Sequence, residues 1–322
     1  TFKGGGDATA AGRAVHETGE FDYAWNLQLA PDVLSKMAEA GLGENVVAFG
    51  TAVERILLNQ TNVDPALGDQ RGVIGNPHPF LTDKAVRQAM SMAIDRALLT
   101  EIGYGDFGRL TCNVLPAPAI FASTANDSCL VQDIEGAKAV LEAAGWTDTN
   151  GNGFRDKDGV ELSVLYQTST NAVRQDYQAL IKQWWEEIGI ETELRNIDAS
   201  VFFGSDPGSD DTFQKFFADV EMFTNVFDGT DPEAYMAGWT CEQAPQPSNQ
   251  WQGNNMPRFC SDEYDALRAE MAVTGDINER ARLAKAMNDI LMQEYIILPL
   301  THRGRNSAHA KTLGGVQLNV WD

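Results

Sequence analysis

Residues 160–197 read VELSVLYQTSTNAVRQDYQALIKQWWEEIGIETELRNI, and this stretch decides the fold class. Its first part, about 160–167, is rich in β-branched and aromatic residues and predicts a strand. Residues 172–188 predict a helix, and residues 191–197 predict a second strand. A strand, a helix and a strand in this order predict two strands of one sheet that a helix connects.

The elements around this unit alternate in the same way, which is the pattern of an α/β protein. Before it, we predict helices at 7–18, 31–40, 82–98 and 133–144 and strands at 46–49 and 53–60. After it, we predict a strand at 219–226, helices at 232–239, 262–272 and 277–294, a strand at 296–300, and a polar segment from there to Asp322. Thr82 is the expected cap of the 82–98 helix, whose apolar residues share one face.

The composition excludes several classes of protein. The chain has 322 residues, with 24 Lys and Arg against 46 Asp and Glu, which gives a formal net charge of −22. A protein this acidic lacks the positive surface that binds nucleic acid, and an anionic membrane would repel it. Hydrophobic residues make up 43% of the chain, enough for a real core. We expect a soluble globular protein of about two domains, or of one large one.

The four cysteines form two local pairs, Cys112 with Cys129 and Cys241 with Cys260. Neither pair has C-x-x-C spacing, and no histidine is near enough in sequence to suggest zinc. The local connectivity closes short loops that contain Pro, Asn and Gly. We predict these two disulfides and an oxidising compartment, with four buried thiols in a cytosolic protein as the alternative.

Signatures of catalysis are mostly missing from the sequence. There is no P-loop, no G-x-S-x-G elbow and no H-E-x-x-H motif. The glycines from Gly103 to Gly108 match a dinucleotide pattern, but they follow a helix and open none, so we interpret them as a helix-ending turn. Glu186 and Glu187 could suggest a secreted hydrolase, but adjacent helical residues point in different directions. We do not expect an enzyme.

An Asp/Asn/Gly loop resembles a calcium loop in part. Oxygen-bearing side chains recur at loop positions 1, 3, 5 and 9, which are Asp148, Asn150, Asn152 and Asp156. Gly159 occupies loop position 12, where a calcium loop has an acidic residue that binds the ion with both oxygens. A structural calcium site is therefore one interpretation, and a solvated hairpin tip is the other. We expect no other cofactor.

Several segments, taken in order, resemble the family 5 extracellular solute-binding proteins, the dipeptide, oligopeptide and nickel receptors of ABC importers. The most specific is VRQAMSMAIDR at 86–96, which is similar to the family's "VRQALxxAIDR" helix. The other matching segments are ETGEFDY at 17–23, VERILLNQT at 53–61, AKAVLEAAGW at 137–146, DP at 231–232, EYDAL at 263–267 and ILPL at 297–300. Together they cover nearly the whole chain.

The resemblance implies a periplasmic binding protein-like (type II) fold of two α/β lobes, with one lobe complete and the other partial. In this family the "G-E-x-D" segment lies well inside the chain, so the sequence resembles the C-terminal part of a longer receptor. We expect 1–50 to belong to the first lobe, 51–78 to form a hinge or connector and 79–295 to form the second lobe. Residues 296–322 would be the return hinge strand and the C-terminal part of the first lobe.

The resemblance also implies a ligand site. Dipeptide receptors hold the ammonium group of the peptide with the first Asp of a W-x-x-D-x-x-D-P stretch, and here Asp228 takes that position while Asn225 replaces the Trp. Trp239 begins a disulfide-closed loop similar to theirs. The Arg that those receptors use for the ligand carboxylate has no counterpart, because Thr168 falls there and Arg174 follows a few residues later.

We therefore predict the binding component of an ABC importer, which closes over a peptide-like solute and presents it to a permease. The same fold could instead serve nickel, an opine or an oligosaccharide. The resemblance implies a periplasmic or extracellular monomer, either free or tethered to the membrane by a lipid, with no nucleic-acid partner.

Overall fold

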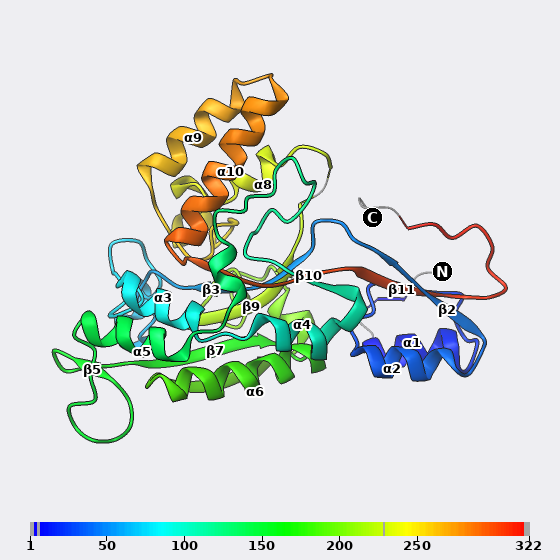
Figure 1. Ribbon diagram of the computed structural model, residues 1–322, viewed down its shortest axis with the longest axis horizontal. Helices are drawn as coiled ribbons and strands as arrows, with labels where there is room; N and C mark the ends of the chain where they lie inside the picture. Colours follow the sequence, from blue (N-terminus) through cyan, green and yellow to red (C-terminus); the bar gives the residue numbers. More distant parts are fainter. Residues whose placement is uncertain (1–2, 5–6, 228, 319–322) are drawn as a thin grey trace.

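A computed structural model describes residues 3–4, 7–227 and 229–318 of the chain. Its centre is a six-stranded sheet in the order β4-β10-β3-β9-β7-β8 (Figure 1). The strands are β4 (Gly108–Leu110), β10 (Ile297–Arg303), β3 (Val53–Leu58), β9 (Val220–Asn225), β7 (Ser163–Ser169) and β8 (Glu191–Ile197). β7 is parallel to both β8 and β9, and α6 (Ala172–Glu187) connects β7 to β8. The predicted strand-helix-strand unit and the α/β class are confirmed.

Helices α3 (Lys84–Met92), α4 (Arg96–Tyr104), α5 (Ile134–Ala143) and α6 share one hydrophobic core with the six-stranded sheet. The prediction of one continuous helix over 82–98 is wrong, because the chain breaks between α3 and α4. The carboxylate of Asp95 accepts a bond from the backbone N–H of Leu98 (2.9 Å) and so begins a new helix. Asp83, rather than Thr82, caps α3. Apolar periodicity did not reveal the break, because the buried residues of both helices join the same core.

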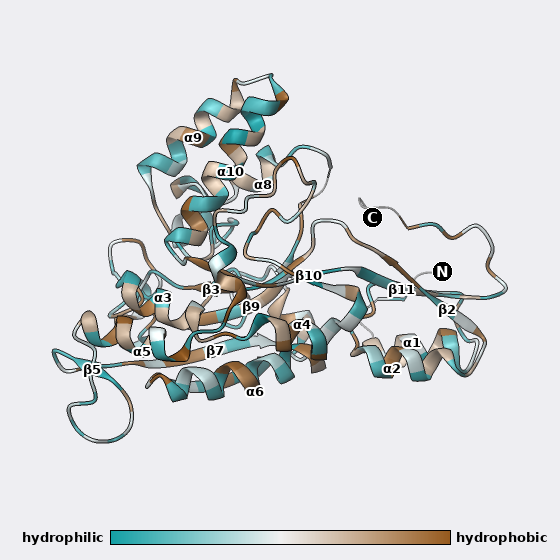
Figure 2. Cartoon of the chain, viewed as in Figure 1, coloured by the Kyte–Doolittle hydropathy of each residue, from teal (hydrophilic) through white to brown (hydrophobic). Residues whose placement is uncertain are grey.

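The opposite face of the sheet is covered by α8 (Glu233–Ala237), α9 (Asp262–Ala272) and α10 (Ile277–Gln293), which share a second core. Figure 2 shows that α9 and α10 alternate between hydrophilic and hydrophobic residues, as expected for helices with one buried face. Short elements complete this part of the chain. They are α7 (Ala199–Phe202), the hairpin β5 (Asp156–Lys157) and β6 (Val160–Glu161), and 3₁₀ turns at 65–70, 105–107, 127–130, 241–243 and 247–249.

A second, three-stranded sheet extends to one side of the molecule in the order β1-β11-β2 (Figure 1). It comprises β1 (Tyr23–Ala24), β11 (Arg305–Ala310) and β2 (Gly43–Ala48), and α1 (Ala8–His16) and α2 (Pro31–Ala38) pack on it. The strand β11 lies within the segment that we predicted to be only polar. It is ordered by backbone pairing on both sides rather than by a hydrophobic pattern.

Two chain segments run between the sheets: β2 leads into β3, and β10 leads into β11. We call residues 49–52 and Gly304, where these segments leave one sheet for the other, the crossover. The division into lobes at 50, 78 and 295 stays a prediction. Both predicted disulfides, Cys112–Cys129 and Cys241–Cys260, are confirmed. None of the described helices is long and apolar enough to span a bilayer.

Candidate ligand-binding site

Three parallel strands end side by side next to the crossover. β7 ends at Ser169, β8 at Ile197 and β9 at Asn225. Asn225 pairs with Val53, the first residue of β3 after the crossover. Ligands of open α/β sheets bind outside the carboxyl ends of the strands. We therefore locate the candidate site at this edge.

One row of side chains crosses four adjacent strands at the same edge. The register pairs Arg109 of β4 with His302 of β10, His302 with Val53 of β3, and Val53 with Asn225 of β9. Directly paired residues of a sheet present their side chains on the same face. We call Arg109, His302, Val53 and Asn225 the cross-strand row. It lies on the sheet face that α8 and α10 cover elsewhere.

An aromatic residue of the crossover packs on one end of the row. The Arg109 guanidinium lies 4.0 Å from the ring centroid of Phe49, and the rings of Phe49 and His302 meet edge to face at 5.7 Å. The Nε2–H of His302 donates to the carbonyl of Gly50 (2.8 Å), which fixes the ring. Burial lowers the pKa of His302, and the neighbouring Arg109 lowers it further. His302 is therefore neutral at pH 7, and Arg109 is the cation of the row.

A buried charged centre occupies the opposite face of the sheet. Glu54 is fully buried, and its carboxylate accepts bonds from Arg174 Nε (2.8 Å), Tyr104 Oη (3.1 Å), Gln28 Nε2 (3.2 Å) and the Thr224 hydroxyl. We call these five residues the charged centre. Gln28 belongs to the part of the chain that carries the smaller sheet, so the centre ties that part to the six-stranded sheet.

Arg303, the last residue of β10, extends the charged centre to the crossover. Its Nε donates to Thr224 (2.9 Å), and its Nη1 donates to Asn26 (3.1 Å). Burial alone would raise the pKa of Glu54, but Arg174 and then Arg303 stabilise the carboxylate, and the net effect lowers its pKa. Glu54 is therefore ionised at neutral pH, and its buried charge is compensated by hydrogen-bonded arginines.

The residues predicted to bind ligand fall into different environments. Asn225 is half-buried at the end of β9, in the cross-strand row. Thr168 is buried and donates to a β9 carbonyl (2.6 Å), and Arg174 is part of the charged centre. Trp239 is 2% exposed in the core beneath α8. Asp228 lies outside the described residues. Their binding roles stay predictions.

In the Asp/Asn loop, the candidate calcium ligands accept bonds from the loop's own backbone. Asp148 accepts from the N–H groups of Gly151 (2.6 Å) and Gly153 (2.9 Å), and Asn150, Asn152 and Asp156 each accept from a backbone N–H in the same way. Within the described residues, no three or more His, Cys, Asp or Glu side chains are grouped to hold a metal ion. The calcium site stays a prediction that calorimetric titration with millimolar calcium tests.

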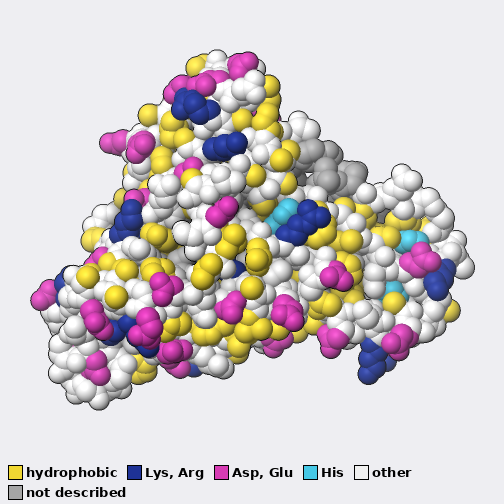
Figure 3. All heavy atoms as spheres, viewed as in Figure 1, with side chains coloured by type: hydrophobic (Ala, Val, Ile, Leu, Met, Phe, Trp, Pro, Cys, Tyr) yellow, Lys and Arg dark blue, Asp and Glu magenta, His cyan; other side chains and the backbone are white. Residues whose placement is uncertain are grey.

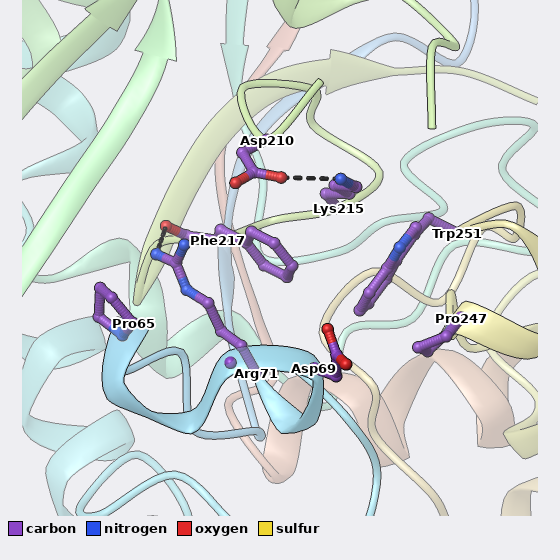
Figure 4. A pocket seen from close by; sticks show the side chains of 9 residues that line it. Pro65, Asp69, Arg71, Asp210, Lys215, Phe217, Pro247 and Trp251 are labelled. Atoms are coloured by element: carbon purple, nitrogen blue, oxygen red, sulfur yellow. Dashed lines mark hydrogen bonds and ion pairs between the residues drawn. The ribbon is translucent and has the colours of Figure 1, made fainter. Parts of the chain in front are cut away.

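A hollow of about 640 Å³ lies at the far ends of β3 and β9, away from the crossover (Figure 4). Phe217 and Trp251 line it at right angles. Its cations already have partners, because Lys215 pairs with Asp210 (2.7 Å) and Arg71 donates to the carbonyl of Phe217 (3.1 Å). We call this feature the distal hollow. We do not place the ligand there, because it is far from the carboxyl ends of the strands.

Comparison with known sequences identifies the family. A sequence model of the bacterial extracellular solute-binding proteins, family 5 (middle), matches residues 1–250. The chain belongs to this family. The oligopeptide-binding protein AppA of Bacillus subtilis is 32% identical to this solute-binding protein over 120 residues, 37% of the chain and 22% of that relative. The heme-binding protein A of Haemophilus influenzae is 25% identical over 287 residues, 86% of the chain and 48% of the relative.

Solved structures show the same fold. AppA in complex with a nonapeptide superposes with a TM-score of 0.79 at 18% identity, covering 98% of this solute-binding protein and 56% of AppA. NikZ of Campylobacter jejuni with Ni(L-His) gives a TM-score of 0.77 at 18% identity, covering 97% and 56%. The binding-protein-like fold predicted from the sequence is confirmed. The chain spans about half the length of these solved proteins. It spans less than half the length of the two curated relatives.

Sequence reasoning missed most residues of this solute-binding protein's site, Glu54, Phe49 and Arg109 among them. The sequence offers a weak signal for Glu54, because a charge within the apolar run VERILL of a buried strand needs a buried partner. Nothing local singles out Arg109. Its position next to His302 depends on a pairing between strands almost 200 residues apart.

Proposed function

We propose that this protein is the substrate-binding component of an ABC importer. It binds a peptide or peptide-like solute between two lobes and delivers the solute to the permease. The observation that carries the proposal is the cross-strand row. It places polar and aromatic side chains next to the carboxyl ends of β7, β8 and β9, beside the crossover between the two sheets. The names of the relatives, which include oligopeptide-binding and murein peptide-binding proteins, support a peptide.

We further propose that the protein acts outside the cytoplasm, in the periplasm or the extracellular space, either free or held by a lipid. The two disulfides support this location, because such bonds persist in oxidising compartments. Figure 3 shows a concave part of the surface between the α8–α10 part and the part that carries β2 and β11, with a histidine next to a basic side chain. Such a recess suits a ligand that is enclosed by hinge closure without covalent chemistry.

Binding is tested by tryptophan fluorescence with the full-length protein that contains this sequence. We expect saturable binding of alanine peptides of two to six residues. Saturation by nickel, an opine or an oligosaccharide, with none by peptides, would replace the peptide with that solute. Turnover of a peptide would contradict the assignment as a receptor.

The predicted ammonium anchor gives the sharper test. Asp228→Asn should weaken peptide affinity at least tenfold, because the variant removes one charge-assisted contact. Asp262→Asn is the matched control, since it removes one charge at the outward start of α9. Equal affinity of wild type and Asp228→Asn would refute the anchor.

A further inference from the structure

The distal hollow has the make-up of a binding site that is separate from the cross-strand row. Phe217 and Trp251 meet at right angles, with ring centroids 5.2 Å apart, and form an aromatic corner (Figure 4). Two carboxylates and two cations also line the hollow, namely Asp69, Asp210, Arg71 and Lys215. Its volume of about 640 Å³ is within the usual range of small-molecule sites, about 300–1,000 Å³.

The hollow is held in shape by bonds between the three loops that form it. The buried guanidinium of Arg258 donates to the carbonyls of Lys215 (2.6 Å) and Pro245 (3.1 Å) and so joins two of the loops. Arg71 joins the third loop to them, because it donates to the carbonyl of Phe217 (3.1 Å). A ligand that enters a preformed hollow of this kind pays little for ordering the protein.

Trp251 reaches the hollow through an unusual backbone conformation. Gln250 and Trp251 are both left-handed, with φ of 55° and 61°, which is uncommon for residues other than glycine. The backbone N–H of Trp251 donates to the carbonyl of Gln246 (2.9 Å), and the disulfide Cys241–Cys260 closes the loop. Such conformations persist where the surrounding structure fixes them, and they cluster at functional sites. The half-buried indole ring of Trp251 therefore has a fixed place at the hollow.

The polar groups of the hollow keep bonding capacity for a ligand. Among the residues that the structure describes, the exposed carboxylate of Asp69 has no partner. The guanidinium of Arg71 uses its Nε and Nη2 and leaves Nη1 without one. The two carboxylates and two cations of the lining cancel in formal charge. The hollow therefore favours an uncharged ligand whose groups both donate and accept hydrogen bonds.

We propose that the distal hollow binds an uncharged saccharide of one or two pyranose rings. The C–H face of a pyranose is apolar and packs on an aromatic ring, while its hydroxyl groups donate to carboxylates and accept from guanidinium groups. The aromatic corner supplies the first contact, and Asp69 and Arg71 supply the second. This site is additional to the proposed solute site at the crossover and does not depend on it.

The test is saturation-transfer difference NMR of the full-length protein, titrated to millimolar concentrations of maltose, cellobiose or N,N′-diacetylchitobiose. The wild type should bind at least one of these disaccharides saturably. Trp251→Leu should weaken that binding by about tenfold or more, because it removes the aromatic face. Asp69→Asn should weaken it by about tenfold, because a hydrogen bond to a charged acceptor is lost. Trp25→Leu is the matched control, since Trp25 is 68% exposed in the part that carries the smaller sheet, and it should keep the wild-type affinity.

The fold of both test variants is checked by far-UV circular dichroism. Asp69→Asn keeps the proposal testable if Trp251→Leu does not fold, because Asp69 is exposed and bonds to no other described residue.

Three outcomes would overturn the proposal. The first is that none of the three disaccharides binds. The second is wild-type affinity in either folded variant, which would place the saccharide elsewhere. The third is competition by tetra-alanine, which would place the saccharide in the proposed solute site. If the protein instead binds no alanine peptide of two to six residues, the proposed function fails, and the two variants still decide whether the hollow binds a saccharide.

Discussion

Replacing Glu54 with Gln tests whether the charged centre holds the two parts of the chain together. The substitution keeps the shape of the side chain but removes the buried negative charge that Arg174 contacts at 2.8 Å. Arg174 and Arg303 would then be buried without a counter-charge. Breaking a buried ion pair by removing one partner costs about 3–5 kcal/mol. We expect Glu54→Gln to lower the free energy of unfolding by that amount at pH 7.

The loss should depend on pH, with a sign that follows from the lowered pKa of Glu54. A carboxyl group whose pKa is lower in the folded state adds stability above its unfolded pKa. It loses that stability as the pH falls through the folded pKa. The unfolded pKa of Glu is about 4.3. The stability difference between wild type and Glu54→Gln should therefore be constant above about pH 5 and shrink as the pH falls below about 4.

Equilibrium urea unfolding, followed by far-UV circular dichroism at several pH values, measures this difference. Glu193→Gln is the matched control, because Glu193 is exposed on β8 and the net charge changes equally. The control should change stability by less than about 0.5 kcal/mol. A cost of less than about 1 kcal/mol for Glu54→Gln, or a difference that grows as the pH falls, would refute our account of the centre.

Three further variants test other parts of the structure. Replacing both Cys112 and Cys129 with Ser should cost about 3 kcal/mol in urea unfolding, because the disulfide closes a loop with a sequence separation of 17; a variant as stable as wild type would contradict this. Gly103→Ala should cost about 1–3 kcal/mol, because an added Cβ would lie 2.6 Å from Tyr177. Combining it with Tyr177→Leu should give less than the sum of the two losses, and strict additivity would argue against the clash. Arg280→Gln should raise the pKa of Asp231 in an NMR titration, because hydrogen bonds from Arg280 hold that pKa low; an unchanged pKa would show that these bonds do not persist in solution.

The local parts of the fold follow from the sequence. The unit β7–α6–β8 was predicted with nearly its observed limits, because periodicity and turn residues act over a few positions. The break between α3 and α4 was missed, because both helices bury their apolar residues in one core and only the cap at Asp95 separates them. The polar strand β11 was missed because its order comes from pairing on both sides.

The site is harder to predict, because its residues are brought together by contacts between segments that are far apart in the sequence. Arg174 was recognised as a candidate, but its partner Glu54 is 120 residues away, and only the fold shows that the two neutralise each other. The cross-strand row likewise needs the order β4-β10-β3-β9, which no local pattern encodes. Resemblance to a family supplied the fold and the segment around Asn225, while the cation at the other end of the row required the structure.

Amide hydrogen exchange with and without bound tetra-alanine tests the central claim most directly, because it reports where the solute binds. We predict slower exchange in residues 49–53, 108–110 and 225–227 when the peptide is present. We predict unchanged exchange in residues 65–71 and 247–251, which include residues that line the distal hollow. Slower exchange confined to the distal hollow, with no change around the crossover, would contradict the site described for this solute-binding protein.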